Sequence, residues 1–185
     1  RLGLSIALVL IDAKIFLPKQ GAEISFLQPL VDDERLFRTL FESFLREFYR
    51  FNSANSFVGG RKYLWTDSSK ALVPSMRTDV NIECNDSVIV IDAKCTPKSV
   101  LTRRDFSSKS LNSAHLYQLF AYLAHASAMN PYKLVAGVLV YPEFDRPVDE
   151  TINTLNGRIR VKTINFMQGW ELISEELLKL VEPPC

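Results

Sequence analysis

The stretch from residue 76 to residue 95 reads Met-Arg-Thr-Asp-Val-Asn-Ile-Glu-Cys-Asn-Asp-Ser-Val-Ile-Val-Ile-Asp-Ala-Lys-Cys. It contains two apolar runs, one formed by Val80 and Ile82 and one over residues 88–91, on either side of Asn85-Asp86. Asn and Asp tolerate the positive φ angles of a tight turn, so the pattern predicts a two-residue β-hairpin. This hairpin sets the register of the residues around it.

With Asn85 and Asp86 as its loop, the hairpin places Asp79 directly opposite Asp92. Facing Cβ atoms are about 4.5–5.5 Å apart, and like charges at such a pair destabilise the sheet. A divalent cation held between the two carboxylates would turn this repulsion into binding. Strand alternation also puts Lys94 on the face of the two aspartates. The opposite face is apolar, so we expect one face to pack and the other to gather the charges; the apolar residues are Val80, Ile82, Ile89, Ile91 and Ala93.

An Asp followed, one strand later, by Asp-x-Lys is typical of PD-(D/E)xK nucleases. In those enzymes the carboxylates bind Mg²⁺ and the lysine acts beside the attacking water. The sequence therefore predicts a catalytic centre formed by Asp79, Asp92 and Lys94, with the Ala93 carbonyl as a further metal ligand.

The composition is that of a globular protein without a strong overall charge. The 185 residues are 47% hydrophobic and 23% charged, with a formal net charge of +1. A nucleic-acid surface must therefore be local. The three cysteines form no Cys-x-x-Cys motif, which indicates a reducing compartment such as the cytoplasm.

The first residues are apolar over 2–11, a run too short to span a bilayer, so we expect no membrane association. We expect residues 1–30 to be the remnant of a preceding region or a linker, and residues 31–185 to form the nuclease domain. Asp12-Ala13-Lys14 repeats the later Ile-Asp-Ala-Lys motif, but no facing Asp precedes it. We interpret this repeat as a coincidence.

A helix is predicted from about residue 34 to residue 51, with an apolar face at helical spacing. Glu42 lies between Arg38 and Arg46 at i,i+4 spacing, which on residues alone favours a surface ladder of ion pairs over a third metal-site carboxylate. After the hairpin, residues 96–112 are expected to be loop-like and basic. Their cations would contact DNA phosphates beside the cleavage centre; among them are Arg103, Arg104 and Lys109.

A second helix is predicted over 113–129, with a core stripe of Leu116, Leu119, Phe120 and Leu123. A second stripe contains His115, Gln118, Tyr122 and His125. Gln118 and Tyr122 are four residues apart, so this pair is expected to orient a phosphate or to brace the lysine. Strands are then predicted over 134–141 and 158–164 and a helix over 170–181, which gives an α/β or α+β fold with a mixed central sheet flanked by helices.

Several motifs together resemble the McrC family, the nuclease subunit of McrBC-type modification-dependent restriction systems. They are Leu-Phe-Glu-Ser-Phe-Leu-Arg-Glu-Phe-Tyr (40–49), Pro-Ser-Met-Arg-Thr-Asp (74–79), Ile-Asp-Ala-Lys (91–94), His-Leu-Tyr-Gln-Leu-Phe-Ala-Tyr-Leu (115–123) and Thr-Ile-Asn-Phe (163–166). The resemblance implies a restriction-endonuclease-like PD-(D/E)xK core that uses Mg²⁺, for which Mn²⁺ can substitute, and cuts double-stranded DNA in a bacterium or archaeon. It also implies an AAA+ GTPase partner of the McrB type, engaged through an amino-terminal portion that we expect to be missing from this sequence.

The resemblance assigns residues as well. It implies that Asp79 and Asp92 are metal ligands, that Lys94 is the catalytic lysine and that Glu42 belongs to the catalytic centre, against the ladder interpretation above. Gln118 and Tyr122 match a Gln-x-x-x-Tyr motif of related nucleases. Cys95 departs from the family, in which Tyr commonly follows Asp-x-Lys.

Two other functions fit the same residues. One is a PD-(D/E)xK nuclease that needs no GTPase, of the exonuclease or resolvase type, and it would cut DNA alone. The other is a catalytically silent module that binds DNA or a partner; the complete Asp, Asp and Lys set argues against it.

Overall fold

The computed structural model describes residues 34–52, 57–65, 72–95, 101–105, 108–143 and 146–182. The expected amino-terminal remnant and the Asp12-Ala13-Lys14 repeat lie outside these residues. The helices are α3 (Glu34–Asn52), α4 (Ser113–Met129) and α5 (Trp170–Leu180). The strands of the main sheet are β1 (Phe57–Gly59), β4 (Val80–Glu83), β5 (Ser87–Ala93), β8 (Leu134–Pro142), β9 (Asp149–Thr154) and β10 (Gly157–Ile164).

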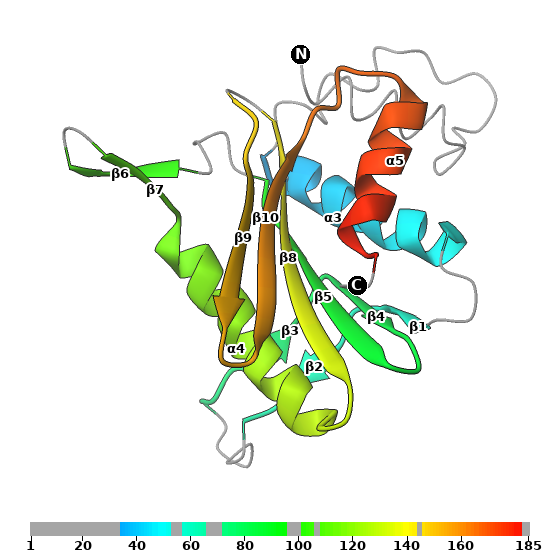
Figure 1. Ribbon diagram of the computed structural model, residues 1–185, viewed down its shortest axis with the longest axis vertical. Coiled ribbons are helices and arrows are strands. Elements are labelled where there is room, and N and C mark those ends of the chain that lie inside the picture. Colours follow the sequence, from blue (N-terminus) through cyan, green and yellow to red (C-terminus); the bar gives the residue numbers. More distant parts are fainter. Residues whose placement is uncertain are drawn as a thin grey trace.

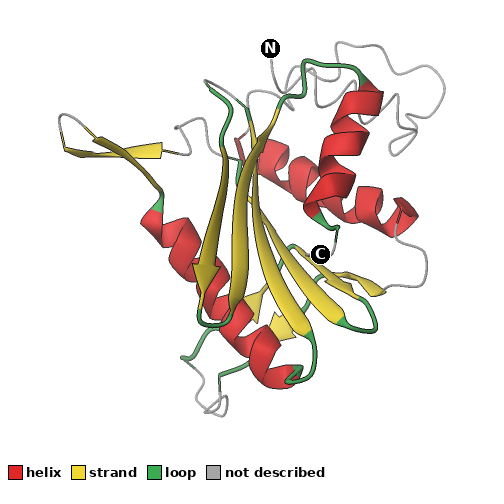
Figure 2. Cartoon of the chain, in the orientation of Figure 1, coloured by secondary structure: helices red, strands yellow, loops and turns green. Residues whose placement is uncertain are grey.

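The main sheet is mixed and has helices on both faces (Figure 1). Its strand order is β1-β4-β5-β8-β10-β9, with β5, β8 and β10 parallel and the other pairs antiparallel. The colouring by secondary structure shows α4 on one side and α3 with α5 on the other (Figure 2). The expected α+β fold with a mixed central sheet is confirmed.

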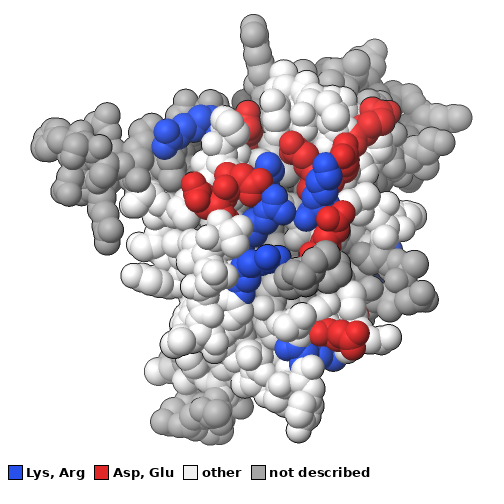
Figure 3. Space-filling model, in the orientation of Figure 1, with Lys and Arg blue, Asp and Glu red and all other residues white. Residues whose placement is uncertain are grey.

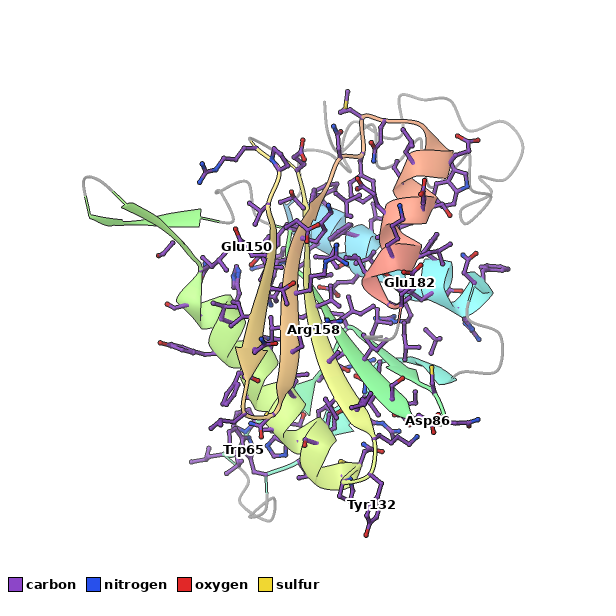
Figure 4. The ribbon with its side chains drawn as sticks, viewed as in Figure 1. Trp65, Asp86, Tyr132, Glu150, Arg158 and Glu182 are labelled. Atoms are coloured by element: carbon purple, nitrogen blue, oxygen red, sulfur yellow. The ribbon has the colours of Figure 1, made fainter. Side chains whose placement is uncertain are left out.

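The hairpin β4–β5 has the register that its turn residues predict. Val80 pairs with Ile91 and Glu83 pairs with Val88, which leaves Asn85-Asp86 as the loop. The Cys84 amide donates to the Ser87 carbonyl at 2.9 Å and closes the turn. Asp86 marks the tip of the hairpin, at the opposite end of β5 from Asp92 (Figure 4).

Both faces of β5 are packed, so the expectation that only one face packs is wrong. The predicted apolar face contributes Val80, Ile82, Ile89, Ile91 and Ala93 to a core with α3 and α5. On the other face, Val88 and Val90 are fully buried against α4. The reason is that β5 lies between β4 and β8 in the middle of the sheet, where both faces are covered.

Helix α4 has its predicted bounds, but the face that it buries differs from the predicted core stripe. Leu119 and Leu123 are buried as expected, whereas Phe120 is 37% exposed and Tyr122 is 5% exposed. A Cβ at Gly137 would lie 2.9 Å from Leu119 Cδ2, so the helix packs directly on the backbone of β8. This close contact decides which side of the helix is buried and brings Gln118 to the carboxyl end of β5.

Residues 96–112 contain a second hairpin and are not simply loop-like. It comprises β6 (Leu101–Asp105) and β7 (Ser108–Leu111), extends from the main body and leads into α4 (Figure 1). A register shift after Arg103 marks a β-bulge. A further ladder of two short strands joins β2 (Lys62–Tyr63) to β3 (Met76–Arg77). None of the described helices combines the length and the apolar character that a membrane span requires.

Candidate active site

The carboxylates and the lysine of the predicted motif meet at the carboxyl end of β5. Asp79 immediately precedes β4, Asp92 is the penultimate residue of β5 and Lys94 follows that strand. Asp79 Oδ2 accepts a hydrogen bond from the Ala93 amide at 2.8 Å, which ties the two strands together at this end. The facing arrangement of Asp79 and Asp92 follows from the confirmed hairpin register.

These residues line a cavity of about 310 Å³. Polar side chains from α3, from the end of β5 and from the first turns of α4 converge there, so the lining of the cavity is mostly polar. Its lining residues are Arg38, Glu42, Asp79, Asp92, Ala93, Lys94, Cys95, His115 and Gln118.

Asp92 is the most buried charged group at this position. The residue is 1% exposed, and burial raises its pKa to about 6, with the negative charge of Asp79 adding to the shift and the positive charge of Lys94 opposing it. Asp92 Oδ2 lies 2.7 Å from Lys94 Nζ as an ion pair. The ammonium of Lys94 thus partly balances the charge of this buried carboxylate.

The other two carboxylates are also shifted toward the protonated form. Burial raises the pKa of Asp79, while the Ala93 amide and the charges of Lys94 and Arg46 oppose the shift. Burial and the charge of Asp79 raise the pKa of Glu42. Carboxylates with raised pKa values gathered in one cavity are typical of a functional site.

Lys94 is held by a chain of hydrogen bonds that crosses from the sheet to α4. Lys94 Nζ donates to Gln118 Oε1 at 2.8 Å, and Gln118 Nε2 donates to Tyr122 Oη at 2.8 Å. Tyr122 Oη in turn donates to the Arg77 carbonyl at 2.9 Å. Of the two roles expected for Gln118 and Tyr122, the contacts match the bracing of the lysine.

Glu42 reaches the cavity from α3, where the charges of Arg38 and Arg46 lower its pKa against the effect of burial. Arg46 Nε donates to the Asp79 carbonyl at 3.2 Å, so α3 also fixes the backbone beside the first aspartate. The helix thus presents a third carboxylate to the site and holds the chain that carries Asp79.

The sequence placed His115 on the stripe of Gln118 and Tyr122 but gave it no role, and it did not identify Tyr141 at all. His115 lines the cavity, and its Nδ1 lies 2.8 Å from Tyr141 Oη. The signal that pointed to His115 was its i,i+3 spacing from Gln118, which puts both side chains on one face of α4. No sequence signal connects α4 to Tyr141, because that residue lies on β8.

Arg103, Arg104 and Lys109 are predicted to contact phosphate, and their side chains lie outside the described part of the structure. Their backbone belongs to the β6–β7 hairpin, in which Arg103 pairs with Lys109. On the face formed by β9, β10 and α5, cationic and acidic side chains interleave (Figure 3). Examples are the ion pairs of Asp149 with Arg160 and Lys162.

The donor set suits a hard cation such as Mg²⁺. Asp79, Asp92 and the Ala93 carbonyl offer oxygen ligands, and Asp92 Oδ2 is buried beside Lys94. Among the described residues, no group of three or more His, Cys, Asp or Glu side chains is arranged to hold a metal ion. The chain therefore offers two carboxylates and a carbonyl, and Mg²⁺ sites of this kind leave the remaining positions to water and phosphate.

Comparison with known proteins identifies the family. Residues 3–142 match the model of the McrBC 5-methylcytosine restriction system component family. The chain is also 33% identical over 158 residues to the type IV methyl-directed restriction enzyme EcoKMcrBC of Escherichia coli (strain K12). This alignment covers 81% of the chain and 44% of the relative, so the chain spans less than half of the relative's length. The chain belongs to the McrBC 5-methylcytosine restriction system component family.

Proposed function

We propose that this chain is the nuclease part of a modification-dependent restriction system and hydrolyses phosphodiester bonds of double-stranded DNA with Mg²⁺. The observation that carries the proposal is the pairing of Asp79 with Asp92 beside Lys94 in one cavity, where burial raises the pKa of both aspartates. Two buried carboxylates that face each other repel, and a cation between them offsets this cost. Mg²⁺ is the ligand whose chemistry fits both carboxylates.

In this proposal Asp79, Asp92 and the Ala93 carbonyl hold Mg²⁺. The bound ion would supply Lewis acidity, neutralising charge on the scissile phosphate and making water a better nucleophile. Lys94 Nζ donates to Gln118 Oε1 at 2.8 Å, so its ammonium stays beside Asp92, where it would orient the attacking water or stabilise the negative charge on the phosphoryl oxygens. Glu42, with its raised pKa, would accept a proton from water at the edge of the same cavity.

The proposed substrate is DNA that carries methylated cytosine, and the proposed partner is an AAA+ GTPase of the McrB type. The family description names 5-methylcytosine restriction, and the E. coli relative is named as a methyl-directed restriction enzyme. Recognition of the methyl group and engagement of the GTPase are proposed for the full-length subunit in its complex, because the chain covers only part of its relative.

The test uses the full-length subunit assembled with its GTPase partner, methylated duplex DNA, GTP and Mg²⁺. We expect double-strand cleavage by the wild type and none by Asp92→Asn, with Glu150→Gln as a charge-matched control on the exposed start of β9. Cleavage by Asp92→Asn at the wild-type rate would refute the assignment. Cleavage without GTP or methylation would favour the GTPase-independent nuclease.

Anomalous diffraction from crystals soaked in Mn²⁺ tests the metal site separately. A peak between the carboxylates of Asp79 and Asp92 is expected. Absence of a peak there, together with DNA binding but no cleavage in any assembly, would favour the silent binding module.

A further inference from the structure

The cavity contains a histidine for which the proposed metal chemistry gives no task. His115 lies in the first turns of α4, and Gln118 follows it by three residues, so both residues face the end of β5. The side-chain oxygen of Gln118 already accepts a hydrogen bond from Lys94. The imidazole of His115 therefore presents a further polar group to whatever occupies the cavity beside the metal ligands.

The contact with Tyr141 is what selects between the two tautomers of neutral His115, according to which partner donates. Tyr141 is 2% exposed, and burial raises its pKa far above the usual range, so its hydroxyl keeps its proton. A buried hydroxyl donor needs an acceptor, and His115 Nδ1 lies 2.8 Å away. When Nδ1 accepts this hydrogen bond, the neutral ring carries its proton on Nε2. Nε2–H is then the donor that His115 has left for a ligand.

The ring is kept neutral by its surroundings. Burial lowers the pKa of His115, and the positive charges of Lys94 and Arg38 lower it further. Tyr141 on β8 contacts the ring, while Lys94 after β5 and Arg38 on α3 are the charged groups that act on it. A neutral donor adds a hydrogen bond to an anion without placing another cation beside Lys94 and Arg38.

We propose that His115 is a substrate-binding residue whose Nε2–H donates to a phosphate oxygen of the DNA strand being cut, and that Tyr141 is the positioning residue that holds this tautomer. The inference rests on the proposed nuclease function and adds a contact to it. Phosphate is the ligand that fits, because Asp79 and Asp92 are assigned to the metal, Glu42 to the attacking water, and a DNA strand brings acceptor oxygens. Phosphate contacts of this kind position a strand without reading its sequence.

The test compares four variants of the full-length subunit in complex with its GTPase partner. His115→Phe removes the donor and keeps the ring, whereas His115→Gln restores an N–H donor on a side chain of similar reach. Tyr141→Phe removes only the hydroxyl. His125→Phe is the matched control, because His125 lies on the same helix but stacks on Tyr63, with ring centroids 5.9 Å apart, away from the cavity lining.

Duplex binding and cleavage are measured for each variant, in addition to metal binding. Binding uses a fluorescent methylated duplex in Ca²⁺ and does not depend on cleavage, and cleavage is measured as kcat/KM in Mg²⁺. We expect His115→Phe to lose about tenfold to a hundredfold in kcat/KM with weaker duplex binding, the range for a hydrogen bond to a charged group. His115→Gln should recover most of the loss, Tyr141→Phe should lose less than His115→Phe, and His125→Phe should match the wild type.

Binding of Mn²⁺ by calorimetry separates damage to the metal site from loss of the phosphate contact, and it should be unchanged in all four variants. Wild-type duplex binding and cleavage by His115→Phe would overturn the inference. So would a His115→Gln variant that folds and binds Mn²⁺ normally but is as defective as His115→Phe, since that result means a packing role. If the wild type binds the duplex but does not cut it, the proposed function fails, and duplex binding by the variants still decides the role of His115.

Discussion

Lys94 Nζ donates to Gln118 Oε1 at 2.8 Å, which fixes the residue after a central strand to the helix that covers that strand. The lysine is thereby held from two sides, by Gln118 and by the ion pair with Asp92 at 2.7 Å. A flexible ammonium held in this way loses little further freedom when a phosphate arrives. Such preorganisation is a common source of rate enhancement in polar active sites.

Gln118→Ala should lower kcat for DNA cleavage by about tenfold, because the substitution removes a hydrogen bond to a charged group and frees Lys94 to leave its position. Mn²⁺ binding should persist, since neither aspartate is changed. The measurement is single-turnover cleavage by the assembled complex. Tyr132→Ala is the control, because Tyr132 is 99% exposed and follows the far end of α4 (Figure 4). Unchanged single-turnover cleavage would show that the hydrogen bond between Lys94 and Gln118 has no kinetic role.

Asp92→Asn should stabilise the metal-free protein above pH 6. Folding raises the pKa of Asp92 from 3.8 to about 6, so the folded state binds this proton more tightly than the unfolded state. The stabilising contribution of the group is therefore complete below pH 3.8 and is lost as the pH rises through 6. Since Asn is neutral at every pH, its advantage should reach about 1–3 kcal/mol near pH 8 and vanish near pH 4.

Chemical denaturation of both proteins in EDTA, at several pH values, measures this difference in the free energy of unfolding. Glu150→Gln, at an exposed position, should show no such pH dependence. A variant less stable than the wild type at pH 8 would mean that the ion pair with Lys94 outweighs the cost of burying Asp92.

Affinity for Mg²⁺ should fall as the pH decreases below about 6. A proton on Asp92 competes with the metal for the same oxygens, and the pKa of that carboxyl is about 6. With one proton released on binding, the dissociation constant should rise about tenfold for each pH unit below that value and be nearly constant at pH 7–8. Calorimetric titration at fixed ionic strength tests this. A flat profile down to pH 5 would contradict the assignment of Asp92 as a ligand.

Gly137→Ala should destabilise the fold by about 1–3 kcal/mol, because the new methyl group would stand 2.9 Å from Leu119 Cδ2 and force α4 away from β8. Gln118 moves with that helix, so cleavage should weaken as well. Thermal denaturation and cleavage are both measured. Gly169→Ala is the control, since an added Cβ there meets only the Glu171 side chain at 3.4 Å. Equal stability of the two variants would mean that α4 adjusts without cost.

The sequence by itself determined the hairpin and its consequences. Turn residues and strand alternation act over a few neighbours, so Asn85-Asp86 was sufficient to set the register that pairs Val80 with Ile91 and brings Asp79 opposite Asp92. The bounds of α4 followed from local periodicity for the same reason. The assignment of Glu42 to the cavity, in contrast, came from family resemblance, since i,i+4 spacing alone favoured a surface ladder.

Only the tertiary structure decided how the helices meet the sheet. Helical periodicity identified an apolar stripe on α4 but could not show that Phe120 turns outward and Tyr122 inward, because that choice depends on the contact of Leu119 with the bare backbone at Gly137. The hydrogen bond between His115 and Tyr141 joins residues 26 positions apart on different elements. Contacts between elements depend on the rotation of each helix over the sheet, which packing of the whole core determines and no local pattern encodes.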